Sequence, residues 1–190
     1  MKKLFILAAL FTGSAIAGTF AEYDFDFQNN QTKGLSNHET HAFSVMTDVT
    51  SNPGLSAGVR AEIENEQGVD AVQGLIQGQV KYNILTYTGL GIPLTPYVTA
   101  AFGEKMYLGR QFDFGQGGIG VSAKLTNRLT LDVAGRYRNG FEAKNQFESN
   151  ETSVKLAYQA TENQTVALRG AFERGQLNYN IIGATYQYHF

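Results

Sequence analysis

Apolar and polar residues alternate with a period of two in segment after segment of this 190-residue chain. Successive side chains of a β-strand point to opposite faces, so this period predicts strands whose two faces meet different surroundings. Ten segments show the alternation: residues 21–27, 43–49, 55–64, 72–82, 96–102, 116–125, 129–138, 152–159, 165–173 and 182–190. The sequence therefore predicts an all-β fold of about ten strands.

The two faces of these segments differ in charge. None of the residues on the apolar face is charged, whereas the opposite face carries Glu22, Asp24, Asp26, Asp48, Arg60, Glu62, Glu64, Lys81, Lys124, Asp132, Arg136, Arg138, Lys155, Arg169 and Glu173. A soluble sandwich or soluble barrel would bury the apolar face and expose the charges. Only 17% of the residues are charged, against about 25% in an ordinary soluble domain. This low content favours an apolar face that meets lipid.

Aromatic residues support the membrane interpretation if successive strands run in opposite directions. One group falls at the far ends of the strands: Phe27, Phe43, Phe102, Tyr137 and Phe172. A second group falls at the near ends: Tyr82, Tyr158, Tyr188 and Phe190. Two such rings, with small aliphatic residues between them, are typical of the aromatic girdles of a transmembrane β-barrel. A soluble fold predicts no such banding.

The connections between segments fit the same topology. Short turns are predicted on one side, at residues 51–54, 126–127 and 161–163, and longer polar loops on the other, at residues 28–39, 65–68, 103–113, 139–150 and 174–178. Residues 83–94 form a long connection on the short-turn side and could contain another short strand. The expected fold is thus a transmembrane antiparallel up-and-down β-barrel of about ten strands, with eight or twelve as alternatives.

The N-terminus has the features of a secretory signal peptide. Lys2 and Lys3 precede an apolar run over residues 4–11, and Ala15-Ile16-Ala17 provides a small-x-small cleavage site. The run is far shorter than the roughly 20 residues of a membrane-spanning helix. We expect residues 1–17 to be removed and residues 18–190 to form one barrel domain. The absence of Cys excludes a disulfide framework.

These features together resemble the small outer-membrane β-barrel proteins of Gram-negative bacteria. The C-terminal Tyr186-Gln187-Tyr188-His189-Phe190 is similar to the assembly signal of that class, in which an aromatic final residue follows alternating aromatics. The resemblance implies contact with outer-membrane lipid and lipopolysaccharide, and with the barrel-assembly machinery through Tyr186, Tyr188 and Phe190. Gly54-Leu55-Ser56 and Gly135-Arg136-Tyr137-Arg138 are similar to strings of the oligogalacturonate-type small porins. No site residues are carried over from that family.

The inward charges are sorted into two predicted walls. An acidic wall comprises Glu22, Asp24, Asp26, Glu62 and Glu64, and a basic wall comprises Lys124, Arg136, Arg138, Lys155 and Arg169. In a ring of ten strands these walls face each other. If they touch, they pair into a closed plug, because buried charges are tolerated when paired. If water separates them, they line a narrow channel, and Arg136, Arg138, Lys155 and Arg169 are the expected contacts for an anion.

The sequence gives little support for a hydrolase site, a divalent-cation site or a dinucleotide site. His38 and His41, near Ser36 and Glu39, could serve a hydrolase site at the rim, but solvated loop histidines are the expectation. Glu62, Glu64, Glu66 and Asp70 could gather divalent cations, although a solvated acidic loop is favoured. Residues 115–120 match G-x-G-x-x-G without the following helix that dinucleotide binding needs. We expect no catalytic residues, metal or cofactor.

The sequence predicts a monomeric outer-membrane barrel. Its favoured function is a narrow, porin-like passive channel for small polar or anionic solutes. A closed structural or adhesin-like barrel with a salt-bridged lumen is the alternative. A net charge of −2 gives no basic surface for nucleic acid.

Overall fold

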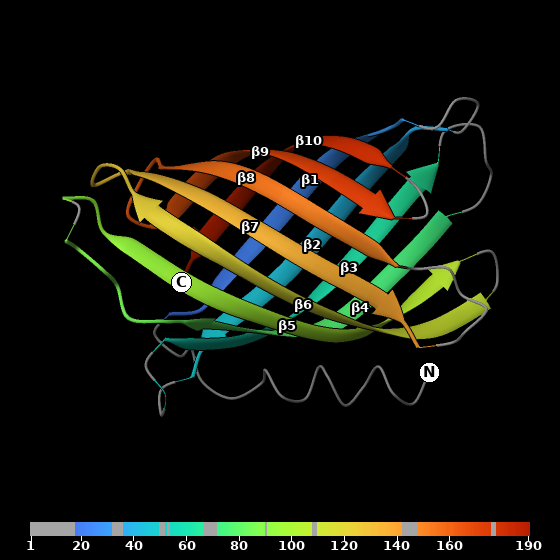
Figure 1. The fold of residues 1–190 in the computed structure, drawn as a ribbon, viewed down its shortest axis with the longest axis horizontal. Helices are drawn as coiled ribbons and strands as arrows, with labels where there is room; N and C mark the ends of the chain where they lie inside the picture. Colours follow the sequence, from blue (N-terminus) through green and yellow to red (C-terminus); the bar gives the residue numbers. More distant parts are fainter. Residues whose placement is uncertain are drawn as a thin grey trace.

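The computed structural model describes residues 18–31, 36–49, 52, 54–66, 72–89, 91–107, 110–141, 148–175 and 178–190. The predicted signal peptide, residues 1–17, lies outside them. In the described residues, ten antiparallel strands form a closed barrel, as the alternation predicts (Figure 1). They are β1 (Phe20–Asn30), β2 (His38–Asp48), β3 (Leu55–Glu66), β4 (Val72–Asn83), β5 (Leu94–Tyr107), β6 (Arg110–Lys124), β7 (Leu129–Gly140), β8 (Ser149–Gln159), β9 (Gln164–Gly175) and β10 (Tyr179–His189).

Closure is made by the pairing of the first strand with the last. Phe20 of β1 lies opposite His189 of β10, and the antiparallel register continues along both strands to Asn30 and Tyr179. Every strand therefore has a partner on each side, so no row of backbone N–H and C=O groups is left at a sheet edge. A closed barrel is one of the two structures that satisfy their backbone polar groups within a bilayer.

The distribution of polarity is the reverse of that in a soluble protein. Large apolar side chains face outward, with Ile182 exposed by 73% and Leu168 by 69%, while Thr40 and Ser44 on the inner face are each exposed by only 2%. Buried polar and exposed apolar faces on the same strands identify lipid as the outer solvent. No helix in the described part of the chain is long and apolar enough to span a membrane.

All nine aromatic residues of the two predicted girdles lie on outward-facing positions. Eight are exposed, from 36% at Tyr188 to 70% at Phe190, and Phe27 is half-buried. Phe27 alternates with the buried Asp26, so it shares the outward face of β1 with the exposed Tyr23. The division into two rings at the two membrane surfaces remains our interpretation.

The end of the barrel away from the C-terminus, here called the distal end, differs from the sequence prediction. Residues 103–113, expected to be a loop, belong largely to β5 and β6, which extend to Tyr107 and from Arg110. Here the polarity of the wall inverts: Phe112 and Phe114 are buried inside, and Asp113 faces outward. This inversion explains the error, because strands that emerge from lipid into water no longer carry an apolar outer face.

The opposite end, here called the proximal end, has short hairpins and the C-terminus (Figure 1). Thr126 shapes the β6–β7 turn, where its Oγ1 accepts hydrogen bonds from the backbone N–H groups of Arg128 and Leu129 at 3.2 and 3.0 Å. Between β4 and β5, the described residues contain an isolated bridge, Tyr87 to Leu94, and no further strand. The count of ten therefore stands against the alternatives of eight and twelve.

The outward apolar face generates a test of the membrane orientation. Leu168→Arg places a charge on the lipid-facing surface between the two aromatic groups. We expect it to lower the free energy of unfolding by about 2–4 kcal/mol, the cost of an arginine near the bilayer midplane. Urea unfolding in lipid vesicles measures this change. Leu168→Ala is the control for lost apolar area, and equal effects of the two variants would contradict a lipid-facing Leu168.

Candidate functional site

The barrel interior contains two cavities, one opening toward each end. The distal cavity has a volume of about 790 Å³ and the proximal cavity about 690 Å³. Side chains that line both cavities lie at one level, which we call the waist: Glu22, Gln79, Gln116, Asp132, Lys155 and Thr185. These six residues come from six different strands. The two cavities therefore adjoin at the waist, and side chains from six strands separate them.

One ion-pair network joins the acidic and basic walls across the distal cavity. Arg169 of β9 contacts Asp26 of β1 at 2.5 Å and Glu151 of β8 at 2.5 Å. Arg136 of β7 contacts the second oxygen of Glu151 at 2.6 Å. Gly183 makes space for this arrangement, because a Cβ there would overlap the Asp26 carboxylate. The walls therefore touch at Arg169.

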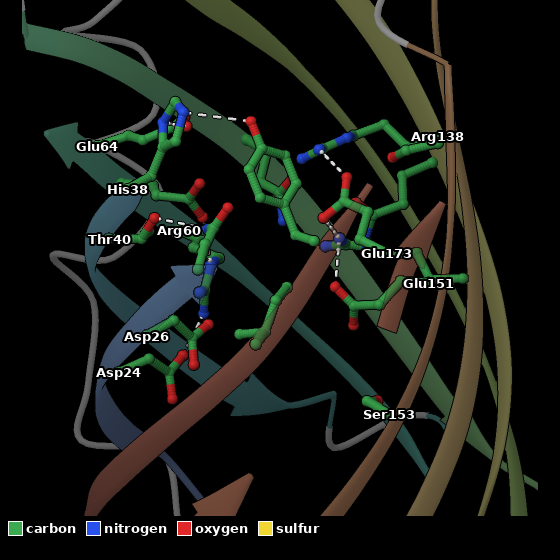
Figure 2. A pocket seen from close by; sticks show the side chains of 18 of the residues that line it. Asp24, Asp26, His38, Thr40, Arg60, Glu64, Arg138, Glu151, Ser153 and Glu173 are labelled. Atoms are coloured by element: carbon green, nitrogen blue, oxygen red, sulfur yellow. Dashed lines mark hydrogen bonds and ion pairs between the residues drawn. The ribbon is translucent and has the colours of Figure 1, made fainter. Parts of the chain in front are cut away.

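A neighbouring network lies within the basic wall. Arg138 contacts Glu173 of β9 at 3.0 Å, and Arg136 contacts the other oxygen of Glu173 at 3.5 Å (Figure 2). Two arginines of the predicted basic wall thus share carboxylates that come from their own side of the barrel. The wall predicted to be basic is a mixed one.

The acidic wall holds its own cation. Arg60 of β3 donates to Asp24 Oδ2 at 2.5 Å and lies 3.5 Å from Glu62. The Thr185 hydroxyl donates to the other oxygen of Asp24 at 2.6 Å. Figure 2 shows Arg60 reaching down the lumen toward Asp24. Arg60 thus offsets part of the charge that this wall concentrates.

A third cluster surrounds Glu64 near the distal end. Its carboxylate contacts His38 Nδ1 at 2.6 Å and Lys105 Nζ at 3.0 Å, and His38 Nε2 lies 3.2 Å from the Tyr179 hydroxyl (Figure 2). His38 is only 4% exposed. The expectation of a solvated loop histidine is wrong for His38, because β2 begins there and turns the ring into the lumen.

His41 also belongs to β2, and that expectation is wrong for it too. It lies on the outward face, where its Nδ1 is 2.7 Å from the Tyr23 hydroxyl and its ring is 5.2 Å from Phe25. The two histidines therefore point to opposite faces of the barrel and share no site. Among the described residues, no three His, Asp or Glu side chains are grouped to hold a metal. Asp70, one of the residues considered for cations, lies outside the described part.

The waist is held by one long ion pair and by short hydrogen bonds to Asp132. Lys155 lies 3.6 Å from Glu22, and this is the longest ion pair among the described residues of the lumen. Asp132 accepts hydrogen bonds from the Tyr97 hydroxyl at 2.7 Å and the Ser122 hydroxyl at 2.6 Å. The Tyr97 ring lies against Gly120, where a Cβ would overlap it. The waist thus combines one loose ion pair with a braced tyrosine.

The residues of both predicted walls lie in the interior. All five of the acidic wall, with Arg136, Arg138, Lys155 and Arg169, line the distal cavity, and Lys124 lines the proximal one. Sequence reasoning missed Glu151 and Lys105, which lie just beyond the predicted strand segments. Continuing the alternation by one residue before Thr152 and by three after Phe102 would have placed both side chains inside.

The distal lining carries an excess of negative charge. It includes ten Asp and Glu residues and seven Lys and Arg residues, a difference of three negative charges with His38 neutral. Each arginine of the predicted basic wall already contacts at least one carboxylate. The distal cavity therefore presents carboxylate oxygens to an entering solute at least as readily as guanidinium groups.

Comparison with solved structures shows the fold of small outer-membrane β-barrels. The β domain of the Bordetella autotransporter BrkA matches with a TM-score of 0.55 and 8% identity over 91% of this chain and 99% of that chain. The NanC porin matches with a TM-score of 0.53 and 8% identity, over 90% and 100%. The KdgM porin in complex with disordered oligogalacturonate matches with a TM-score of 0.50 and 10% identity, over 90% and 99%. No protein-family model and no curated protein sequence matches the chain.

Glu151 is the centre of the distal network, and its removal tests that network. Glu151→Gln removes one carboxylate partner from each of Arg136 and Arg169 while preserving side-chain size, and leaves them Glu173 and Asp26. Breaking a buried ion pair from one side costs about 3–5 kcal/mol, so we expect a loss of stability near 3 kcal/mol because the arginines keep their other partners. Urea unfolding in vesicles measures it. Glu162→Gln in the exposed β8–β9 turn is the matched control and should change stability by less than about 1 kcal/mol; equal midpoints for both would contradict the network.

Proposed function

We propose that the protein is a narrow passive channel of the bacterial outer membrane for small polar solutes. The observation that carries this proposal is the pair of cavities that share the six waist residues. Space inside the barrel thus extends from both ends to the waist, where the side chains of these six residues lie between the two cavities. A barrel of ten strands is close to the size at which side chains fill the interior, so only small solutes would fit.

The waist contains the contact that is easiest to separate. Lys155 is the most exposed of the ion-paired side chains, at 33%, and its distance to Glu22 is the longest. A long, partly hydrated ion pair contributes little stability. Movement of this flexible lysine would join the two cavities without disturbing the shorter arginine pairs.

The charge of the lining favours neutral polar and cationic solutes over anions. The sequence predicts anion contacts from positive charge alone, at Arg136, Arg138, Lys155 and Arg169. In the structure, carboxylates already contact all four of these side chains. Rings of Asp and Glu are the common filters of cation channels. The NanC and KdgM porins share the fold, and the KdgM structure contains oligogalacturonate; at this low identity they support a porin-like role without indicating a solute.

A closed structural or surface-interaction barrel is the second candidate. It is favoured by the density of the ion-pair networks around Arg169 and Arg136, which cross-link β1, β7, β8 and β9. In this alternative the lumen is rigid and the function lies in the distal loops. Current across a membrane distinguishes the two candidates directly.

We also propose that the C-terminal strand carries the assembly signal and that the barrel is monomeric. Tyr186, Tyr188 and Phe190 are exposed on one face of β10 and its end, and the rings of Tyr188 and Phe190 meet edge to face at 5.2 Å. An exposed aromatic row is the kind of surface that the assembly machinery and outer-membrane lipid would contact.

The decisive experiment is single-channel recording in a planar bilayer with refolded residues 18–190. We expect uniform current steps with a preference for cations. Glu22→Ala combined with Lys155→Ala removes the loose pair at the waist without changing net charge, and should increase the unit conductance. Ser153→Ala, in the distal lining, is the control and should leave conductance unchanged. A silent membrane with insertion verified by heat-dependent gel mobility would contradict the channel and favour the closed barrel.

The solute charge is tested separately in the same recordings. Arg136→Ala removes a positive charge from the distal lining, and should raise the preference for cations. Arg174→Ala removes the same charge from the outward face of β9, and should have a smaller effect. An anion preference in the unmodified protein would overturn the proposed selectivity while leaving the channel intact.

A further inference from the structure

The connection between β4 and β5 is an apolar hairpin, here called the arm, whose described residues are 84–89 and 91–93. The chain has no charged residue from Tyr82 to Gly103. Four large side chains of the arm are exposed: Ile84, Leu85, Tyr87 and Ile92, with Leu85 at 90%. In Figure 1 the arm, in green, projects from the left end of the barrel beyond β4 and β5. Such an exposed apolar patch marks a surface that meets something other than water.

The arm has a defined backbone. Tyr87 and Leu94 exchange two backbone hydrogen bonds of 2.8 Å, and Ile84 N–H donates to the Pro96 carbonyl at 2.8 Å. The side-chain hydroxyls of Thr86 and Thr95 lie 2.9 Å apart. These contacts continue the β4–β5 hairpin past the end of the barrel wall, so the apolar side chains are presented by a fixed structure.

A bulge in this hairpin turns Tyr87 outward. Asn83 pairs with Tyr97, and the next bridge joins Tyr87 to Leu94, so three residues on one side oppose two on the other. An extra residue in one strand reverses the facing of the residues that follow it. Tyr87 therefore shares the outward face of Leu94, which continues the lipid-facing face that includes Val98.

Two other turns at this end have a different character, because each carries a charged residue. The β6–β7 turn includes Arg128 and the β8–β9 turn includes Glu162, both exposed. Leu85 follows the outward-facing Tyr82 by three residues, a rise of roughly 10 Å along a strand. Barrel strands are tilted by about 40°, so the rise along the membrane normal is about 8 Å. This distance is similar to the depth of the headgroup layer, which is roughly 5–8 Å on each side of a bilayer.

We propose that the arm is an interfacial anchor that binds the headgroup layer of the membrane leaflet at the proximal end. Its exposed face is continuous with the lipid-facing wall, it carries no charge, and Tyr87 supplies an amphipathic ring of the type that membrane interfaces favour. The partner is the lipid surface. A second copy of the chain or a plug of the lumen are the competing occupants that the test separates.

The chain contains no Trp, so a single introduced Trp reports on one site. The experiment measures the fluorescence of Leu85→Trp in vesicles whose lipids carry bromine at a shallow or a deep acyl position. We expect a blue-shifted emission and a loss of intensity that is greatest with shallow bromine, with protection from aqueous iodide. Leu168→Trp, on the lipid-facing wall, should be quenched most by deep bromine and verifies insertion.

The matched control is Thr161→Trp, which follows the outward Tyr158 by three residues in a polar turn. Equal quenching of Leu85→Trp and Thr161→Trp by shallow bromine would overturn the proposal. The quenching would then reflect only the position of each site along the membrane normal. Iodide quenching of Leu85→Trp without bromine quenching would also overturn it. Protection from both quenchers would indicate a second copy or the lumen instead. Tyr87→Trp repeats the measurement if Leu85→Trp does not insert. None of these outcomes depends on channel activity.

Discussion

The pairing of β1 with β10 is the constraint on which the rest of the structure depends. It closes the sheet, so every strand satisfies its backbone groups on both sides and no edge meets lipid. Closure also fixes two surfaces of different curvature and surroundings, one outside and one inside. Since side chains alternate between them, the period of two becomes a partition between lipid and lumen. The outward leucines and the inward carboxylates are both consequences of that partition.

The lumen must then accommodate many charges in a small space. A buried carboxylate or guanidinium is costly unless it is paired, and the strand register decides which partners are available. Glu151 lies opposite Arg136 in the β7–β8 pairing, and Lys155 lies opposite Arg169 in the β8–β9 pairing. Arg169 thus has a cation beside it on β8 and reaches Asp26 and Glu151 instead. The short pairs gather at the distal level, and the waist is left with the longest.

The alternation of the sequence was enough to predict the number of strands, their inward and outward faces and the interior position of both charged walls. It failed where the surroundings of the wall change. At Phe112 and Phe114 the barrel has left the lipid, so apolar residues face inward and the strand resembles a loop. His38 was misjudged for the same reason, since it lies where β2 emerges. The partners of Arg136 and Arg138 could not be predicted, because pairing requires the register of neighbouring strands as well as the face of each residue.

Fold likeness does not separate the possible functions of this barrel. The matched structures include porins and autotransporter domains with similar TM-scores, so the backbone is compatible with more than one role and function depends on the lining. The longest ion pair among the described residues of this lining lies at the waist. Arginines bridge the strands at the distal level, while a lysine with a flexible stem and a 3.6 Å contact holds the waist. Guanidinium groups form fixed, forked contacts, whereas an ammonium group on a flexible stem is more mobile. The lining therefore combines stiff arginine pairs at the distal level with a looser lysine contact at the waist, and the proposed channel depends on that difference.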